Sequence, residues 1–157
     1  MNTTNTRALD IANYILNVAN RDGDLISNLK MQKLLYYAQA WYLVNYGIPL
    51  FVDEIEAWEL GPVIKAVYSH FKKFKSAPII YKSTNKEDQA FTKKQVNYLS
   101  EFYDVFSKYT AHELVNMTHN ELPWKEAFEK KDIISVDTMK AYYIKVLKER
   151  KNARQTP

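Results

Sequence analysis

The chain has 157 residues, the length of one domain, and 46% of them are hydrophobic, which is enough for a sizeable core. The absence of cysteine excludes disulfides, thiolate metal sites and a cysteine nucleophile. The formal net charge of +4 is concentrated in the segment from Lys145 onward, and the remaining body carries 17 charges of each sign. A neutral body argues against an extensive nucleic-acid-binding surface, so nucleic acid is not an expected partner.

Neither a targeting signal nor a membrane span is predicted. The first ten residues, MNTTNTRALD, lack the basic and apolar regions of a secretory signal. No uninterrupted apolar run approaches the roughly 20 residues needed to cross a bilayer. We therefore expect a soluble, cytoplasmic protein with no membrane partner.

The first part of the chain predicts two helices. Apolar residues at helical spacing predict an amphipathic helix over residues 6–20. A second helix, capped by Ser27 or Asn28, should run to about Tyr46 and end at Gly47, a residue suited to the left-handed position after a helix. Its broad apolar stripe is typical of a central helix packed on two sides.

The middle of the chain predicts a small β element and a third helix. Residues 51–57 alternate partly and residues 78–82 form a short apolar run, so we predict that these two segments pair. The Gly61-Pro62 pair is interpreted as a helix start, because proline is favoured in the first helical turn. One face of that helix should carry Val63, Val67 and Phe71.

Local capping signals predict the later helices. Thr92 and Thr110 each begin a capping box, Thr-Lys-Lys-Gln and Thr-Ala-His-Glu. Pro123 lies in the first turn of a short helix to about Phe128, and Ser135 caps the last helix. The residues of that helix expected to face inward are Val136, Met139, Tyr143, Val146 and Leu147.

The elements together predict a mainly α fold: a single compact domain of about seven helices with a small two-stranded β element. Residues 1–147 are predicted to form this domain. Residues 148–157 are predicted to form a basic, solvated and frayed C-terminal tail.

No residue pattern predicts catalysis or metal binding. The chain shows neither a glycine-flanked serine elbow nor a phosphate-cradling loop. A His/Glu metal site at His112, Glu113, His119 and Glu121 is conceivable, but the spacing is not HExxH and the segment 118–123 should break the helix. We predict no catalytic residue, no metal and no cofactor, and we do not expect an enzyme.

A cluster of charges of both signs lies in the middle of the chain. Its acids could offer paired carboxylates, but a solvated turn beside a basic stretch is the preferred interpretation. Such a face can also steer a protein partner. The acids are Asp53, Glu54, Glu56 and Glu59, and the basic residues are Lys65, Lys72, Lys73 and Lys75.

Several motifs occur in a characteristic order. They are LKMQKLLYYAQAWYL (29–43), GIPLF (47–51), IEAW (55–58) with Gly61-Pro62-Val63 and Tyr68, then Leu114, Thr118-His119 and Pro123-Trp124. In this order, over about residues 11–147, the chain resembles the Panacea, or SocA-like, domain of bacterial and phage toxin–antitoxin systems.

The resemblance implies an antitoxin that neutralises a cognate toxin by direct protein–protein binding, with the toxin encoded by an adjacent gene. One family member is instead a proteolytic adaptor that delivers its toxin to the ClpXP protease, so a ClpXP-type protease is an alternative partner. A small DNA-binding regulator is a further alternative. Some relatives carry an added DNA-binding domain; the match leaves no room for one in this sequence, so we do not expect autoregulation by DNA binding.

The resemblance also suggests where a partner would bind. The turn around Trp58–Pro62 and the loop at His119–Trp124 are predicted to meet in a docking surface, with solvent-facing Tyr36, Tyr37, Tyr46, Tyr68 and Phe71 as aromatic anchors. The alternative is that these motif residues build the core and that His119 and Glu121 satisfy backbone groups. The predicted partner-binding residues are Tyr36, Tyr37, Trp58, Glu59, Pro62, Tyr68, Phe71, His119, Glu121 and Trp124.

Overall fold

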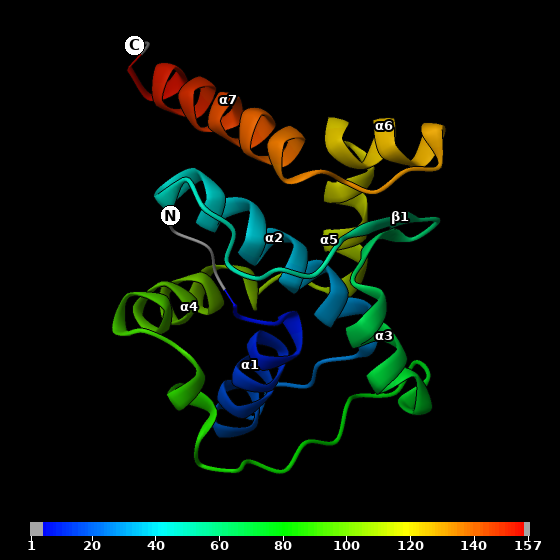
Figure 1. The fold of residues 1–157 in the computed structure, drawn as a ribbon, viewed down its shortest axis with the longest axis vertical. Coiled ribbons are helices and arrows are strands. Elements are labelled where there is room, and N and C mark those ends of the chain that lie inside the picture. The colour runs from blue at the N-terminus through cyan, green and yellow to red at the C-terminus, as the bar shows by residue number, and fades with distance from the viewer. Residues whose placement is uncertain (1–4, 156–157) are drawn as a thin grey trace.

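Helix α2 (Asn28–Tyr46) is the centre of the fold. In the computed structural model, which describes residues 5–155, every residue from Met31 to Ala40 is buried. Figure 1 shows α7 crossing above α2, α1 below it and α3 to one side, and α2 contacts all three as well as α4, α5 and β2. The prediction of a central helix is confirmed, although α2 is covered on all sides of its middle turns.

The elements agree with a mainly α fold. Residues 5–155 form seven α-helices and one antiparallel pair of short strands. None of these helices is both long and apolar enough to cross a membrane. In chain order the elements are α1 (Ala8–Asp22), α2, β1 (Glu56–Trp58), β2 (Gly61–Val63), α3 (Lys65–Phe71), 3-10 turns at Lys72–Phe74 and Glu87–Ala90, α4 (Lys93–Phe106), α5 (Ala111–His119), α6 (Leu122–Lys130) and α7 (Val136–Gln155).

The predicted helix caps are confirmed. The Ser27 hydroxyl accepts from the Lys30 N–H at 3.2 Å, and Gly47 ends α2 in a left-handed conformation with φ of 75°. Thr92 forms a reciprocal capping box with Gln95. At the start of α5, Thr110 accepts from the Glu113 N–H, which is one half of the predicted capping box, and at the start of α7 Ser135 accepts from the Thr138 N–H.

The predicted strand pairing is wrong. β1 pairs with β2 in a local hairpin, with Trp58 opposite Gly61, and not with residues 78–82. Gly61 permits the tight reversal because its φ is +110°, a conformation that L side chains rarely adopt. Phe51, expected in a strand, is held elsewhere: its N–H and its carbonyl both bond to the Gln39 side chain.

The predicted helix start at Gly61-Pro62 is also wrong. These residues lie in β2, and α3 begins only at Lys65. Side chains of α2 keep the segment extended, because Lys33 Nζ donates to the Pro62 carbonyl and Gln32 Oε1 accepts from the Ile64 N–H, both at 2.9 Å. Val67 and Phe71 form the buried face of α3 as predicted, whereas Val63 is buried but belongs to β2 and not to the helix.

The last helix differs in two ways from the prediction. Val136 was expected to face inward but is 37% exposed, whereas Met139 and Tyr143 are fully buried. α7 also continues through Gln155, so residues 148–155 are helical and not frayed. The separation of a 1–147 domain from a 148–157 tail stays a prediction, and residues 1–4 and 156–157 lie outside the described part of the chain.

Gly61 should be the more sensitive of two left-handed glycines to substitution by alanine. A Cβ on Gly61 would lie 2.6 Å from Lys33 Cε and 2.9 Å from Thr118 Oγ1, whereas a Cβ on Gly23 (φ +73°) would meet nothing within 4 Å. Gly23→Ala should therefore cost about 1 kcal/mol of backbone strain. Gly61→Ala should cost about 1–3 kcal/mol more, because it adds overpacking. Urea unfolding of both variants measures this, and equal costs would contradict the crowding at Gly61.

Candidate functional site

The two predicted docking segments meet in space. The Trp124 indole N–H donates to the Trp58 carbonyl at 2.8 Å, which ties α6 to the end of β1. Thr118, in the last turn of α5, lies against Gly61 at the start of β2. The β1–β2 hairpin and the α5–α6 junction are far apart in sequence but contact each other directly in the fold.

Stacked rings define the α5–α6 side of this structure. The His119 and Trp124 rings stack with centroids 4.2 Å apart, and Phe128 continues the stack 4.8 Å from Trp124. His119 Nε2 is buried and has no hydrogen-bond partner among the described residues. On the hairpin side, Trp58 packs edge-on against Tyr68 with centroids 4.9 Å apart. Packed aromatic rings therefore support both the hairpin and the α5–α6 junction.

Glu121 joins three elements beneath this surface. Its carboxylate accepts from the Tyr37 hydroxyl of α2, and the Tyr143 hydroxyl of α7 lies 3.0 Å from the same oxygen. Tyr143 also lies 3.0 Å from the Tyr36 hydroxyl, so Tyr143 can donate to the carboxylate while it accepts from Tyr36. Burial raises the pKa of Glu121 above its usual value. The position of the α5–α6 junction is thereby fixed to α2 and α7.

Several predicted aromatic anchors do not face solvent. Tyr36, Tyr37 and Phe71 are 0%, 1% and 4% exposed, so the prediction of exposed rings at these positions is wrong. The reason is that α7 covers the α2 tyrosines, whose hydroxyls pair inside, and Phe71 belongs to the buried face of α3. Tyr68 is half-buried and Tyr46 is exposed.

The other predicted site residues differ in their exposure to solvent. Glu59 is exposed, and Trp58, His119, Glu121 and Trp124 are half-buried. Pro62, by contrast, is buried in β2. A direct partner contact at any of the ten predicted residues stays a prediction.

Lys33 is a site residue that sequence reasoning missed. Its side chain is fully buried, and its Nζ donates a hydrogen bond to the Pro62 carbonyl. Desolvation lowers its pKa to about 7. The available signal was its place inside the apolar run MQKLLYYA, where a lysine on a helix covered on all sides must be buried.

Two further polar residues of α2 hold the same segment. The Gln32 amide donates to Asn28 Oδ1 at 2.9 Å, and the Asn28 amide donates to the Tyr68 carbonyl at 3.1 Å. With Lys33, these side chains bond the backbone from Pro62 to Tyr68. Most buried polar side chains in proteins are hydrogen-bonded, and these bonds fix the hairpin and α3 against α2.

A pocket of about 460 Å³ opens between α2, the hairpin and the end of α3. Its apolar lining is supplied by Leu29, Trp58, Leu60, Val63 and Tyr68. Lys72 and Lys75 lie at its edge, and both are exposed. The pocket combines an apolar wall with basic side chains at its rim.

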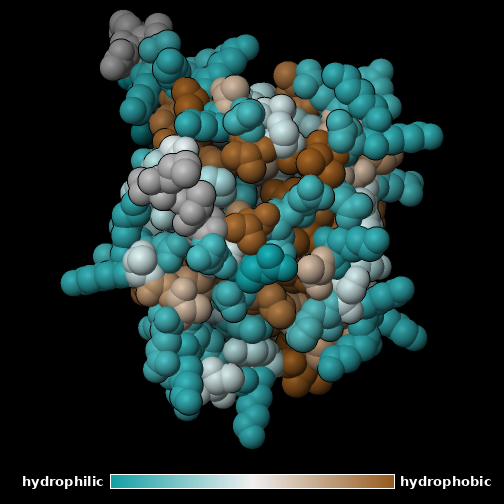
Figure 2. Space-filling view, in the orientation of Figure 1, coloured by the Kyte–Doolittle hydropathy of each residue, from teal (hydrophilic) through white to brown (hydrophobic). Residues whose placement is uncertain are grey.

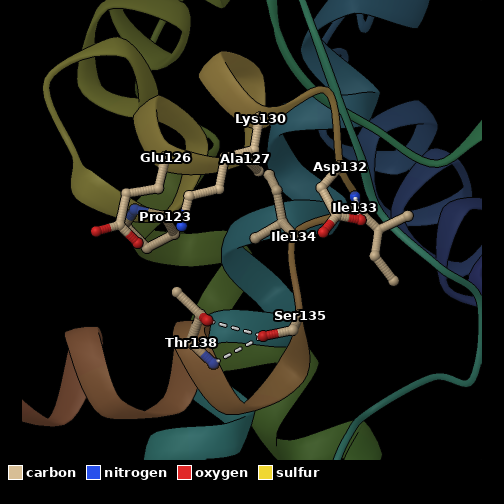
Figure 3. Close-up of a pocket in the computed structure, with 9 residues that line it drawn as sticks. All are labelled: Pro123, Glu126, Ala127, Lys130, Asp132, Ile133, Ile134, Ser135 and Thr138. Atoms are coloured by element: carbon tan, nitrogen blue, oxygen red, sulfur yellow. Dashed lines mark hydrogen bonds between the residues drawn. The ribbon is translucent and has the colours of Figure 1, made fainter.

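A second pocket, of about 340 Å³, lies between α6 and the start of α7 (Figure 3). Its Ser135 hydroxyl is used in capping α7, since it bonds the Thr138 N–H at 3.1 Å and the Thr138 hydroxyl at 2.8 Å. Ile133 at its edge is exposed, as is neighbouring Phe128. Figure 2 shows hydrophobic side chains reaching the surface between α7, α6 and β1. The lining of this pocket is mixed, because charged Glu126, Lys130 and Asp132 line it together with Ile133 and Ile134.

The charged cluster is not a single solvated turn. Asp53 Oδ1 accepts from the Ala8 N–H at 2.7 Å, and the Asp53 carboxylate lies 3.9 Å from Arg7, so this acid holds the start of α1. Within the described residues, no ion pair joins the other three acids to the lysines of α3 and its following turn. No group of three or more His, Asp or Glu side chains in residues 5–155 is arranged to hold a metal.

Replacing Lys33 should change how stability depends on pH. Its pKa is about 7 when folded against 10.5 when unfolded, so the unfolded chain binds the extra proton between these values and stability rises with pH. From about pH 7 to about pH 9 the gain should be about 2 kcal/mol, because one proton contributes about 1.4 kcal/mol per pH unit.

Lys33→Met keeps a side chain of similar length and should remove most of this rise in urea unfolding measured at both pH values. A smaller slope remains, because burial also lowers the pKa of Lys30. Lys72→Met, which alters an exposed lysine, is the matched control and should keep the wild-type slope. An unchanged slope in Lys33→Met would contradict the burial of a charged group at this site.

Comparison with known proteins agrees with the arrangement of motifs. A family model described as antitoxin SocA-like, Panacea domain, matches residues 31–125, a range that contains the hairpin and the α5–α6 junction. Antitoxin SocA of Caulobacter vibrioides (strain NA1000 / CB15N) is 46% identical over 61 residues, which are 39% of this chain and 32% of that protein. The chain thus matches about a third of this relative's length, and no solved structure matches significantly. Because the family model covers more than half of the chain, the chain belongs to the SocA-like, Panacea domain family of antitoxins.

Proposed function

We propose that this chain is an antitoxin that neutralises a cognate toxin by direct protein–protein binding, and that an adjacent gene encodes the toxin. Membership of the SocA-like family supports an antitoxin role. The name of the Caulobacter relative, Antitoxin SocA, supports it too. Binding alone would suffice for this role, so the proposal assigns no catalytic residue and no cofactor.

The observation that carries the proposal is the tie between the hairpin and the α5–α6 junction. The Trp124–Trp58 hydrogen bond joins two segments of the family match into one surface. At the tip of the hairpin, Glu59 is exposed and Leu60 is 56% exposed, although Leu60 is apolar. A surface that is already fixed when free loses little entropy on binding, which favours tight association.

Co-expression with the product of the adjacent reading frame tests the proposal. We expect that product to stop growth when expressed alone, and we expect this chain to restore growth while the amount of the toxin stays unchanged. The two proteins should then co-purify as a complex. Restored growth with a falling amount of toxin, dependent on a ClpXP-type protease, would instead indicate a proteolytic adaptor. A harmless neighbour and no complex would contradict the proposal.

A substitution at the hairpin tip should weaken toxin binding without unfolding the protein. Leu60→Asp places a charge where an apolar contact with the toxin is expected, and we expect at least about a tenfold loss of affinity. Ile80→Asp is the matched control, because Ile80 is 83% exposed in a loop outside this surface. Equal affinities for both variants, measured by titration calorimetry, would show that the hairpin tip is not in the interface.

A further inference from the structure

The pocket between α2, the hairpin and α3 has a mainly apolar lining. Leu29 comes from α2, Trp58 and Leu60 from the hairpin, and Tyr68 from α3. Its volume of about 460 Å³ lies within the range of about 300–1,000 Å³ that is typical of ligand pockets. The pocket can therefore take a large apolar side chain.

The polar groups of α2 in this pocket are already paired with the protein. Gln32 bonds the Ile64 N–H and Asn28, the Asn28 amide bonds the Tyr68 carbonyl, and Lys33 bonds the Pro62 carbonyl. These bonds hold the walls in place. Specificity for a polar occupant must therefore come from side chains at the rim.

The rim carries an excess of positive charge. Lys72 and Lys75 are exposed pocket residues, and Lys73, next to Lys72 in the chain, is exposed as well. Glu59 is the one acid among the residues that line this pocket. Within the described residues no carboxylate forms an ion pair with these lysines. They are available to pair with carboxylates of a partner.

We infer that this pocket binds an acidic and apolar segment of the toxin, in which one large apolar side chain fills the pocket and adjacent Asp or Glu side chains pair with Lys72 and Lys75. The inference rests on the proposed function and adds the chemistry of the partner segment. A nucleic acid fits less well, because its phosphates would leave the apolar walls unfilled and the body of the chain has no net charge to extend the contact.

The first experiment compares two double variants of the full-length chain in binding to the adjacent gene product. Lys72→Glu/Lys75→Glu reverses the rim charges, and Lys82→Glu/Lys86→Glu makes the same change in total charge at exposed loop positions. We expect about a tenfold or greater loss of affinity for the rim variant and a change of less than about twofold for the control. Wild-type affinity should also fall between about 50 mM and about 500 mM salt, and less so for the rim variant. Circular dichroism verifies that both variants are folded.

The second experiment does not depend on the identity of the toxin. The probe is a synthetic peptide with a central tryptophan flanked by glutamates, and its control replaces each glutamate by glutamine. We expect the acidic peptide to bind the wild-type chain and shift the NMR signals of Trp58 and Tyr68. The glutamine peptide, or the acidic peptide with the rim variant, should bind about tenfold more weakly.

The outcomes separate the two proposals. If the toxin binds the wild type and the rim variant equally, the pocket assignment is wrong while the antitoxin function stands. If the toxin does not bind the wild type, the proposed function fails, and the acidic peptide then decides whether the pocket has the inferred specificity. Equal binding of the acidic and glutamine peptides, or displacement of the acidic peptide by duplex DNA at equal charge, would overturn the inference.

Discussion

The hairpin and the start of α3 depend on hydrogen bonds from buried polar side chains of α2. Asn28, Gln32 and Lys33 each bond the backbone of residues 62–68, and Gln32 also bonds Asn28. Two strands of three residues each are marginal on their own, so these bonds supply order that the strands lack. Gln39 plays the same role about two turns further along α2, where it bonds Leu50 and Phe51. The central helix therefore determines the conformation of the irregular segment that follows it.

A second set of buried contacts positions the other half of the candidate site. Glu121 pairs with tyrosines of α2 and α7, which fixes the junction between α5 and α6. From there the Trp124 indole reaches the Trp58 carbonyl. Each half of the site is thus attached to α2 through paired polar groups, and the surface between them is preorganised. Its exposed residues, Glu59 and Leu60, lie on the turn between β1 and β2. Trp124 bonds the first of these strands and Lys33 bonds the second.

The tertiary structure also separates charges that are close in sequence. Asp53 holds the start of α1, where it pairs with Arg7, while Lys72 and Lys75 remain without an ion pair among the described residues. A chain whose body is neutral overall therefore presents a locally basic rim beside an apolar pocket. That combination gives the surface both an apolar anchor site and a preference for one sign of charge.

The sequence by itself determined the mainly α class, most helix boundaries and the family. Caps such as Ser27, Thr92 and Gly47 act within one helical turn, so their effect can be read from neighbouring residues. The ordered motifs also located the two segments that meet at Trp58 and Trp124. These features are either local or repeated along the chain in a recognisable order.

Only the tertiary structure decided the strand partner of β1, the extended conformation at Gly61-Pro62 and the burial of Tyr36, Tyr37 and Lys33. Each depends on residues distant in sequence: Tyr36 is covered by Tyr143, and Pro62 is held by Lys33. Helical periodicity shows which residues share a face, but it does not show how many faces are covered. The physical reason is that burial, and the hydrogen bonds it makes necessary, arise only when all the helices have packed.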